Sequence, residues 1–375
     1  MLLTSIAALA LTLPAAASAP APAPRIESHG KLEWFAGPFD AALVKAKAEN
    51  KIIFIDFWTS WCGPCKALVK NTFSDDTVAA EMKDVICLSV DAESETGVPL
   101  AAKFSVRAYP TMLLLEPDGS VRDQLVGYMA PDKFKQEIQR VKRNQDTLPD
   151  LRKRIAADTR NLKARSELAG KLKQTGDVAG AQAQLAEMKK LDPERESLDT
   201  RKLEYELLTD SIEAEWMKTK ALDTSRLIAY LDKETYPGIL FDGWMRVLQM
   251  DMAVAKKTKD VGARDKANAE ALRAARTAWK HCPPEAKAQA GNQIAWSFWE
   301  LREFASADDK AFALEVVRAA DAAMPNTPQV MDTLACVLFM NGQKDEAAKT
   351  IEKCIQLDPQ NPQWQKRLEE FGVKS

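Results

Sequence analysis

Short apolar runs separated by amphipathic segments make up the first part of the chain. Residues 52–58 are rich in β-branched and aromatic side chains and are too few for a buried helix, which predicts a central strand covered on both faces. The same kind of pattern predicts further strands at 85–91, 111–116 and 121–126. Helices are predicted at 38–48, from 62 onward, and at 75–82, 98–104 and 131–143. Strands that alternate with helices and end in a hairpin favour an α/β fold with a mixed central sheet flanked by helices.

The second part of the chain has helical periodicity and no convincing strand. A polar stretch at 144–149 ends in proline, so residues 144–160 are expected to form a linker and a first helix, and residues 161–375 an all-α domain. Small residues and a closing proline recur there at matching spacing, in the groups Gly176, Ala181 and Pro193; Ala313, Ala320 and Pro325; and Gly342, Ala347 and Pro359. Small residues are needed where two antiparallel helices approach closely, and proline stops the second helix.

This spacing resembles that of the tetratricopeptide repeat (TPR) family, whose unit is a helix-turn-helix of about 34 residues. The resemblance places clear copies at 162–195 and 328–361 and a degenerate copy at 294–327, with divergent helical hairpins at 196–293. Such arrays present a concave face, so the resemblance implies that the helical domain binds a protein partner. A helical domain that merely packs on the first domain is the alternative.

Candidate chemistry lies where the 52–58 strand gives way to a helix. Cys62-Gly63-Pro64-Cys65 occupies this turn, and Cys62 is expected at the helix N-terminus. Unpaired backbone N–H groups and the positive end of the helix dipole stabilise an anion there, which favours the thiolate of Cys62. Cys65, one turn further, lies on the same helical face and within disulfide reach of Cys62. One thiol can therefore attack a substrate disulfide, and the other can resolve the mixed disulfide.

The stretch from Trp61 to Lys66, following an Ile-Asp-Phe-Trp strand, resembles the active site of the thioredoxin superfamily. The Tyr109-Pro110-Thr111 segment resembles the family's loop with a cis proline facing the dithiol, and Gly127 matches the glycine near the end of the last strand. The similarity covers roughly 32–141 and extends to the periplasmic branch that includes the C-terminal domain of transmembrane thiol-disulfide interchange proteins. It implies a thioredoxin fold at 31–143, catalytic Cys62 and Cys65, and supporting roles for Trp61, Gly63, Pro64, Lys66, Tyr109, Pro110 and Thr111.

Asp56 stands where the family has a buried acid, and apolar Ile55 and Phe57 on either side favour its burial. Burial raises the pKa of a carboxyl, which suits Asp56 to move a proton to or from Cys65 as a third catalytic residue. The lysine that usually accompanies this acid is replaced here by Cys87, so Asp56 is expected to lack its customary partner. A surface position on a half-exposed strand is the alternative for Asp56.

Other roles for the cysteines and histidines are weaker. A zinc site needs a second ligand pair, which the isolated remaining cysteines do not supply, and a structural Cys62/Cys65 disulfide would close too small a loop to constrain the unfolded chain. Cys354 occupies a packing position and is expected to be buried and inert, although pairing among Cys282, Cys336 and Cys354 stays open. Neither histidine, His29 in the spacer or His281, is assigned any chemistry.

Composition and the N-terminal pattern bear on location. A chain of 375 residues with 46% hydrophobic side chains suffices for two domains. The net charge is -2 and neither half of the chain is basic, which makes nucleic acid a poor candidate partner. Residues 1–19 combine an apolar run too short to span a membrane with small residues, which predicts a secretory signal cleaved near Ala17 or Ala19. A Pro/Ala-rich spacer follows at 20–30. A soluble protein exported to the periplasm or another extracytoplasmic compartment is expected.

Taken together, the patterns predict an exported thiol-disulfide oxidoreductase, with the reductase direction favoured by the Gly-Pro pair between the cysteines. The expected partners are protein disulfide substrates, an electron donor for which a membrane thiol-disulfide interchange protein is a candidate, and a protein bound by the TPR-like helices. No cofactor beyond the redox-active Cys62/Cys65 disulfide and no metal are expected. A non-enzymatic TPR scaffold and a disulfide oxidase or isomerase are the alternatives.

Overall fold

A computed structural model of the chain describes residues 29–219 and 221–372. The predicted signal at 1–19 and most of the spacer lie outside the described residues. The chain forms two compact units: the first runs to Ala157 and also includes Lys171–Val178, and the second comprises Asp158–Gly170 and the residues from Ala179 onward.

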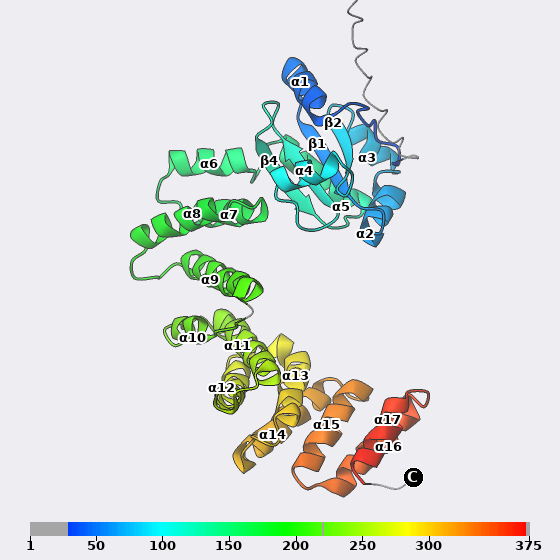
Figure 1. The fold of residues 1–375 in the computed structure, drawn as a ribbon, viewed down its shortest axis with the longest axis vertical. Helices are drawn as coiled ribbons and strands as arrows, with labels where there is room; N and C mark the ends of the chain where they lie inside the picture. Colours follow the sequence, from blue (N-terminus) through cyan, green and yellow to red (C-terminus); the bar gives the residue numbers. More distant parts are fainter. Residues whose placement is uncertain (1–28, 220, 373–375) are drawn as a thin grey trace, which may run out of the picture. The chain divides into compact units, whose positions relative to one another are not determined.

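The first unit is built around a four-stranded sheet (Figure 1). Its elements are α1 (Phe39–Glu49), β1 (Ile53–Trp58), α2 (Gly63–Ala67), a π-helical turn η1 (Leu68–Thr72), α3 (Asp76–Glu81), β2 (Ile86–Asp91), α4 (Gly97–Lys103), β3 (Thr111–Leu115), β4 (Val121–Val126), α5 (Pro131–Lys142) and α6 (Leu148–Ala157). The strand order is β2-β1-β3-β4, with β1 parallel to β2 and antiparallel to β3, and β3 antiparallel to β4. The predicted mixed sheet with flanking helices is therefore confirmed.

Alternation along β1 divides the core of this unit into two layers. Ile53, Ile55 and Phe57 point to one face, where they pack with buried residues of α1 and α4. Phe54 points to the other face and packs with Leu68 of η1 and with buried residues of α3 and α5. Asp56 shares that second face, so its carboxyl is carried into an apolar layer by the central strand.

Both edges of the sheet are occupied by other backbone or side-chain groups. On β2, the N-terminal segment forms a bridge from Trp34 to Cys87, and Phe35 N–H donates to the Cys87 carbonyl at 2.8 Å. On β4, the Gln174 side chain donates to the Gln124 carbonyl at 3.2 Å, and the Gln124 side chain donates back to the Gln174 carbonyl at 3.1 Å.

Residues 171–178 belong to the first unit because of these contacts and one ion pair. Lys171 Nζ lies 2.6 Å from the carboxylate of Asp123, which is 1% exposed and also bound by Arg140 at 2.6 Å. The sequence analysis placed the domain boundary in 144–160. In the structure, α6 belongs to the first unit, and residues 171–178 belong to it as well. A contact between positions so far apart leaves no mark on the local pattern that predicted the boundary.

All elements from Leu162 onward in the described residues are helices. They are α7 (Leu162–Gln174), α8 (Val178–Leu191), α9 (Leu198–Thr219), α10 (Ser225–Leu231), α11 (Pro237–Lys257), α12 (Val261–Lys280), a 3-10 turn η2 (Pro284–Ala286), α13 (Lys287–Glu300), α14 (Ala307–Ala323), α15 (Pro328–Met340), α16 (Lys344–Leu357) and α17 (Pro362–Glu370). The predicted helical domain is confirmed. Across the ranges that the structure covers, every helix is too short or too polar to cross a bilayer.

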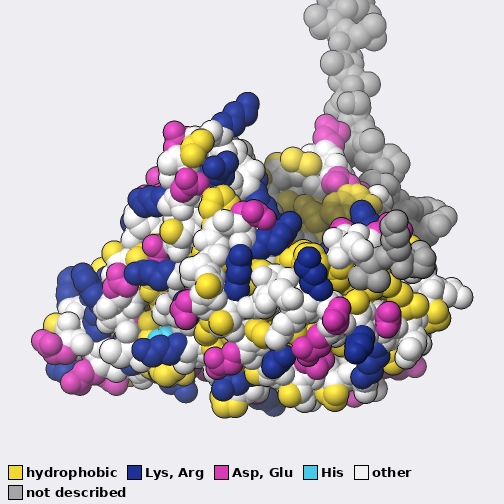
Figure 2. Space-filling model, turned by 90° about the horizontal axis from the view of Figure 1, so that it is seen from below, with side chains coloured by type: hydrophobic (Ala, Val, Ile, Leu, Met, Phe, Trp, Pro, Cys, Tyr) yellow, Lys and Arg dark blue, Asp and Glu magenta, His cyan; other side chains and the backbone are white. Residues whose placement is uncertain are grey.

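The helices can be compared with the ranges of the predicted copies. The copies at 162–195 and 328–361 correspond to the pairs α7 and α8, and α15 and α16. The degenerate copy is shifted, because its first helix, α13, begins directly after η2 at Lys287 and not near Ile294. A buried ion pair joins the last elements, with Arg367 of α17 donating to both carboxylate oxygens of Asp332 on α15 at 2.8 and 3.1 Å. Basic and acidic side chains are interspersed over the face shown in Figure 2, in keeping with the near-zero net charge.

Candidate active site

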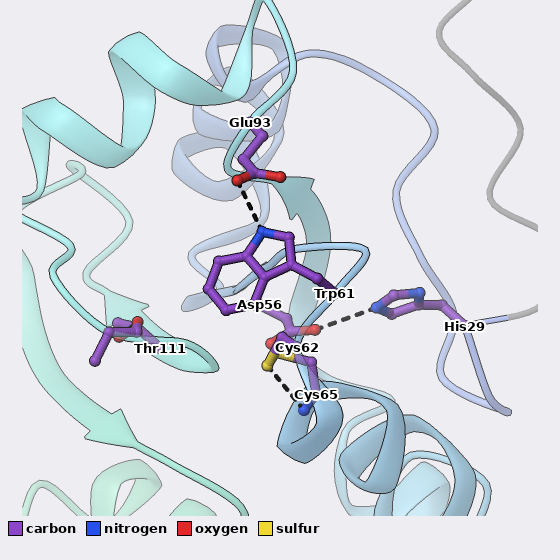
Figure 3. Close-up of a disulfide and its surroundings, with 8 residues drawn as sticks. His29, Asp56, Trp61, Cys62, Cys65, Glu93 and Thr111 are labelled. Carbon is purple, nitrogen blue, oxygen red and sulfur yellow. Dashed lines mark hydrogen bonds and ion pairs between the residues drawn. A yellow bond between two sulfur atoms is a disulfide. The ribbon is translucent and has the colours of Figure 1, made fainter.

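The dithiol motif lies at the end of the central strand. β1 ends at Trp58, a short turn follows, and Cys62 is the N-cap residue of α2. Pro64 lies in the first turn of the helix, where a missing N–H leaves no hydrogen bond unmade. Sγ of Cys62 accepts a hydrogen bond from the backbone N–H of Cys65 at 3.1 Å (Figure 3). The Cys62 sulfur therefore lies at the N-terminus of α2, where backbone N–H groups have no partner within the helix, as the sequence predicted.

Cys62 and Cys65 are joined by a disulfide, with their Cα atoms 5.3 Å apart. The two residues are only 3% and 4% exposed, whereas the intervening Gly63 and Pro64 and the following Lys66 are exposed. The structure therefore shows the oxidised form of the pair, with both sulfur-bearing residues buried and their neighbours in the chain exposed.

Trp61, which precedes Cys62 in the chain, contacts the proline loop. Trp61 is 64% exposed, donates from Nε1 to Glu93 at 2.9 Å, and lies edge-on to Tyr109 with ring centroids 6.1 Å apart. The Tyr109–Pro110 peptide bond is cis. Thr111, which begins β3, donates from Oγ1 to the Ala108 carbonyl at 2.8 Å.

Gly127 links the end of β4 to the proline loop by a backbone hydrogen bond. Its N–H donates to the Pro110 carbonyl at 2.9 Å, and its φ of +87° lies in the left-handed region that glycine adopts readily. The predicted supporting residues Trp61, Tyr109 and Pro110 are therefore brought together at one end of the sheet.

Asp56 is buried, with 1% of its surface exposed, and has a partner that the sequence analysis missed. His29 Nε2 lies 3.2 Å from Asp56 Oδ2, and His29 itself is 8% exposed (Figure 3). Burial raises the pKa of the Asp56 carboxyl, and the hydrogen bond and charge of His29 act in the opposite direction.

One expectation is corrected by this contact, because His29, to which the sequence analysis assigned no chemistry, is the partner of Asp56. Cys87 stands where the family has its lysine, and the structure gives Asp56 a histidine partner instead. The reason is tertiary: the histidine arrives from a segment 27 residues earlier, and nothing in the local pattern around His29 marks it. The one available signal was that His29 is one of only two histidines in the chain and immediately precedes Gly30.

Comparison with known proteins places the site in a family. A thioredoxin-like domain model matches residues 39–142. A thioredoxin H-type of Chlamydomonas reinhardtii is 39% identical over 99 residues, which are 26% of this chain and 80% of that protein. A thioredoxin H-type of Oryza sativa subsp. indica is 37% identical over 94 residues, which are 25% of this chain and 72% of that protein. The chain belongs to the thioredoxin family.

The thioredoxin domain is also similar to part of a larger protein. The thiol:disulfide interchange protein DsbD of Yersinia pestis (strain Pestoides F) is 32% identical over 100 residues, which are 26% of this chain and 17% of that protein. The similarity therefore concerns one domain of each protein.

The other cysteines of this thioredoxin-family chain are free and buried. Burial raises the pKa of the Cys87 and Cys354 thiols to about 12 and also raises those of Cys336 and Cys282. No disulfide joins Cys282, Cys336 and Cys354 in the structure. Within the described ranges, no group of three or more His, Cys, Asp or Glu side chains is arranged to hold a metal ion.

Proposed function

We propose that the protein is an exported thiol-disulfide oxidoreductase that works as a reductase through the Cys62/Cys65 dithiol. The hydrogen bond from Cys65 N–H to Cys62 Sγ carries the proposal, because the donor that reaches Sγ in the disulfide would stabilise a thiolate once the bond is reduced. The exposed Trp61 and the adjoining Tyr109 offer an apolar surface on which a client polypeptide can lie.

The reaction would run in two exchanges. The Cys62 thiolate attacks one sulfur of a client disulfide, so that a mixed disulfide forms and the other client sulfur leaves as a thiolate that takes up a proton. Cys65 then loses its proton and attacks Cys62 Sγ, which breaks the mixed disulfide and releases the second client thiolate. The client gains two electrons, and the Cys62/Cys65 disulfide seen in the structure is the product on the enzyme.

Asp56 is the group proposed to accept the proton from Cys65. Its side chain extends from the strand that leads to the dithiol and is 1% exposed, so the carboxyl is shielded from bulk water. A raised pKa brings such a carboxyl closer to the working pH, which is what general acid-base transfer requires.

The source of electrons is proposed to be a membrane thiol-disulfide interchange protein. The similarity of the thioredoxin domain to one domain of DsbD supports a partner of this class, since both would carry a dithiol of the same fold. The predicted leader at 1–19 supports an extracytoplasmic setting, where a reductase needs such a supply.

The helices from α7 onward are proposed to be TPR-like and to dock a redox partner or client. Gly176 and Gly342, which occupy the same place in the two clear copies, both have positive φ, at +86° and +79°, in the turn between their helices. The small residues Ala181 and Ala347 are fully buried in the second helices, where close helix packing requires them. A hollow of about 290 Å³ between α11 and α13, lined in part by Leu248, Met252 and Trp296, could receive an apolar side chain.

The test uses the full chain with Cys65→Ser. After reduction, this variant should accumulate a mixed disulfide through Cys62 with a disulfide-containing protein substrate, because the resolving thiol is absent. Cys62→Ser should capture nothing. Failure of Cys65→Ser to form the adduct with any disulfide substrate, while the protein remains folded, would favour the rival scaffold role. An oxidase or isomerase would be recognised by a reduction potential well above that of thioredoxin-type reductases.

A further inference from the structure

Among the described residues, the side chain that hydrogen-bonds Asp56 is His29, which comes from outside the strands of the sheet. His29 Nε2 reaches Oδ2 at 3.2 Å, while Oδ1 of the same carboxyl is buried and has no hydrogen-bond partner among the described residues. A buried carboxylate with one of its oxygens unsatisfied is costly unless something favours the charged form. The imidazole is the group placed to do so.

The position of His29 is fixed by a set of specific contacts. The His29 carbonyl accepts a hydrogen bond from Trp34 Nε1 at 2.9 Å, and its ring packs against Trp34 and Trp58 with centroids 5.3 and 5.2 Å apart. The next residues are tied to the body of the domain, since Lys31 N–H donates to the Phe73 carbonyl at 2.7 Å. The imidazole is thus held in place by the rings of Trp34 and Trp58, and its Nε2 atom points to the Asp56 carboxylate.

The remaining titratable groups around Asp56 are few. The Cys62/Cys65 pair follows β1 at the strand-to-helix turn, and Cys87 on the neighbouring strand lies in the same apolar layer with its thiol protonated. The residues facing Asp56 across the sheet are Ser89 on β2 and Met112 on β3, neither of which carries a charge. Without His29, only burial would act on the pKa of the Asp56 carboxyl, and burial raises it.

We propose that His29 is a positioning residue for the redox reaction, which holds Asp56 as a carboxylate so that it can take the proton of Cys65. This inference rests on the proposed reductase function and adds to it a residue from the N-terminal segment. In the resolving step the Cys65 S–H proton passes to Asp56, the Cys65 sulfur forms its bond to Cys62 Sγ, and the client sulfur leaves with the electron pair. His29 keeps its hydrogen bond throughout and exchanges no electrons.

The experiment follows one turnover of the reduced full-length protein with one equivalent of the aromatic disulfide DTNB. Attack by Cys62 releases a first thionitrobenzoate, and attack by Cys65 on the mixed disulfide releases a second, so the two phases report the two steps separately. The rates are measured from pH 5.5 to 9 for the wild type and for His29→Phe, which fills the aromatic pocket but cannot hydrogen-bond. His29→Gln keeps a donor, and His281→Gln, which removes the only other histidine, is the matched control.

We expect the second phase of His29→Phe to be about tenfold slower than wild type at pH 6 and to approach the wild-type rate at pH 9. This is the size of effect that follows when a buried charged group loses a hydrogen bond. The first phase should stay within twofold, His29→Gln should lie between the two, and His281→Gln should match the wild type. In an Asp56→Asn background, His29→Phe should produce no further change, because the group on which it acts is gone.

Three outcomes would overturn the inference. One is a second phase of His29→Phe that superimposes on the wild-type profile. Another is a loss that is equal at all pH values and persists with Asp56→Asn, which would make His29 structural only. The third is a wild type that releases no thionitrobenzoate at all. This result would refute the proposed reductase function as well as the inference, whereas the first two outcomes refute the inference alone.

A measurement without turnover covers the case in which His29→Phe fails to fold. The carboxyl carbon of Asp56 is followed by NMR against pH in the oxidised protein and in His29→Gln. The Asp56 titration should move to higher pH in the variant, since a neutral amide stabilises a carboxylate less than the imidazole does. An unchanged titration would refute the role of His29.

Discussion

The backbone N–H of Cys65 donates to the sulfur of Cys62 across 3.1 Å, so the first cysteine caps the helix that carries the second. Cys87, Cys282, Cys336 and Cys354 are buried instead, and each donates a weak hydrogen bond from Sγ to an oxygen. Burial raises the pKa of all four thiols and so disfavours their ionisation. The chain therefore contains two chemically distinct classes of thiol.

Selective alkylation should separate these classes. In the reduced native protein at pH 7.5, iodoacetamide should modify Cys62 at least ~100-fold faster than Cys87 or Cys354, because the thiolate is the nucleophile and burial raises the pKa of these two thiols to about 12. Peptide mass mapping at short reaction times measures the rates. The same reaction in denaturant is the control and should give similar rates for all cysteines. Native labelling of Cys87 as fast as that of Cys62 would contradict the assignment.

Gly30 should prove essential for seating His29. Its φ is +78°, and a Cβ at this position would lie 2.6 Å from the Phe73 carbonyl carbon and oxygen, so Gly30→Ala must displace the segment. We expect a loss of about 1–3 kcal/mol in the free energy of unfolding, measured by denaturant titration. Gly170→Ala is the matched control, since its Cβ meets nothing within 4 Å and alanine favours the interior of α7. Identical unfolding of Gly30→Ala and wild type would refute this account of the segment.

The helical unit should lose stability as the pH rises through the titration of Asp251. Burial raises the pKa of this carboxyl, which is 6% exposed and accepts a hydrogen bond from Thr224 Oγ1, to about 6. The folded protein then binds more protons than the unfolded chain between about pH 4 and 6, so stability from this group is present below that window and lost above it. The free energy of unfolding of Asp251→Asn, taken relative to that of the wild type, should therefore be higher at pH 7 than at pH 4. The increase should be at most about 2 kcal/mol.

Thermal unfolding at the two pH values measures this difference. Asp223→Asn is an instructive control, because hydrogen bonds from the Ser225 backbone and hydroxyl lower the pKa of Asp223. Its substitution should act with the opposite sign and cost stability at pH 7. A wild-type stability that does not fall between pH 4 and 7 relative to Asp251→Asn would contradict the assignment for Asp251.

Much of the thioredoxin domain could be predicted because its signals are local. The strand expected at 52–58 is observed at Ile53–Trp58, since a short run of β-branched and aromatic residues, interrupted only by Asp56, is typical of a buried strand. The helix expected from residue 62 begins at Gly63, where Cys62 caps it. The candidate site was visible for the same reason, because Asp56, Cys62 and Cys65 lie on one strand, at the following helix start and in the first turn of that helix.

What could not be predicted depends on distant contacts. The pairing of His29 with Asp56 joins segments with no shared pattern, and the return of residues 171–178 to the first unit depends on Lys171 meeting Asp123. Between residues 196 and 293, helices of unequal length such as α9 and α10 replace the regular pairs. A fixed repeat spacing cannot place elements whose lengths are set by their individual packing.

The covered edges of the sheet have a consequence for behaviour at high concentration. The Phe35 backbone N–H donates to the Cys87 carbonyl on β2, and the Gln174 side chain donates to the Gln124 carbonyl on β4. Neither outer strand therefore presents an uninterrupted row of unpaired backbone N–H and C=O groups. A foreign strand that approached would have to break these bonds before it could add to the ladder. Growth of the sheet by addition of foreign strands at its edges is therefore disfavoured.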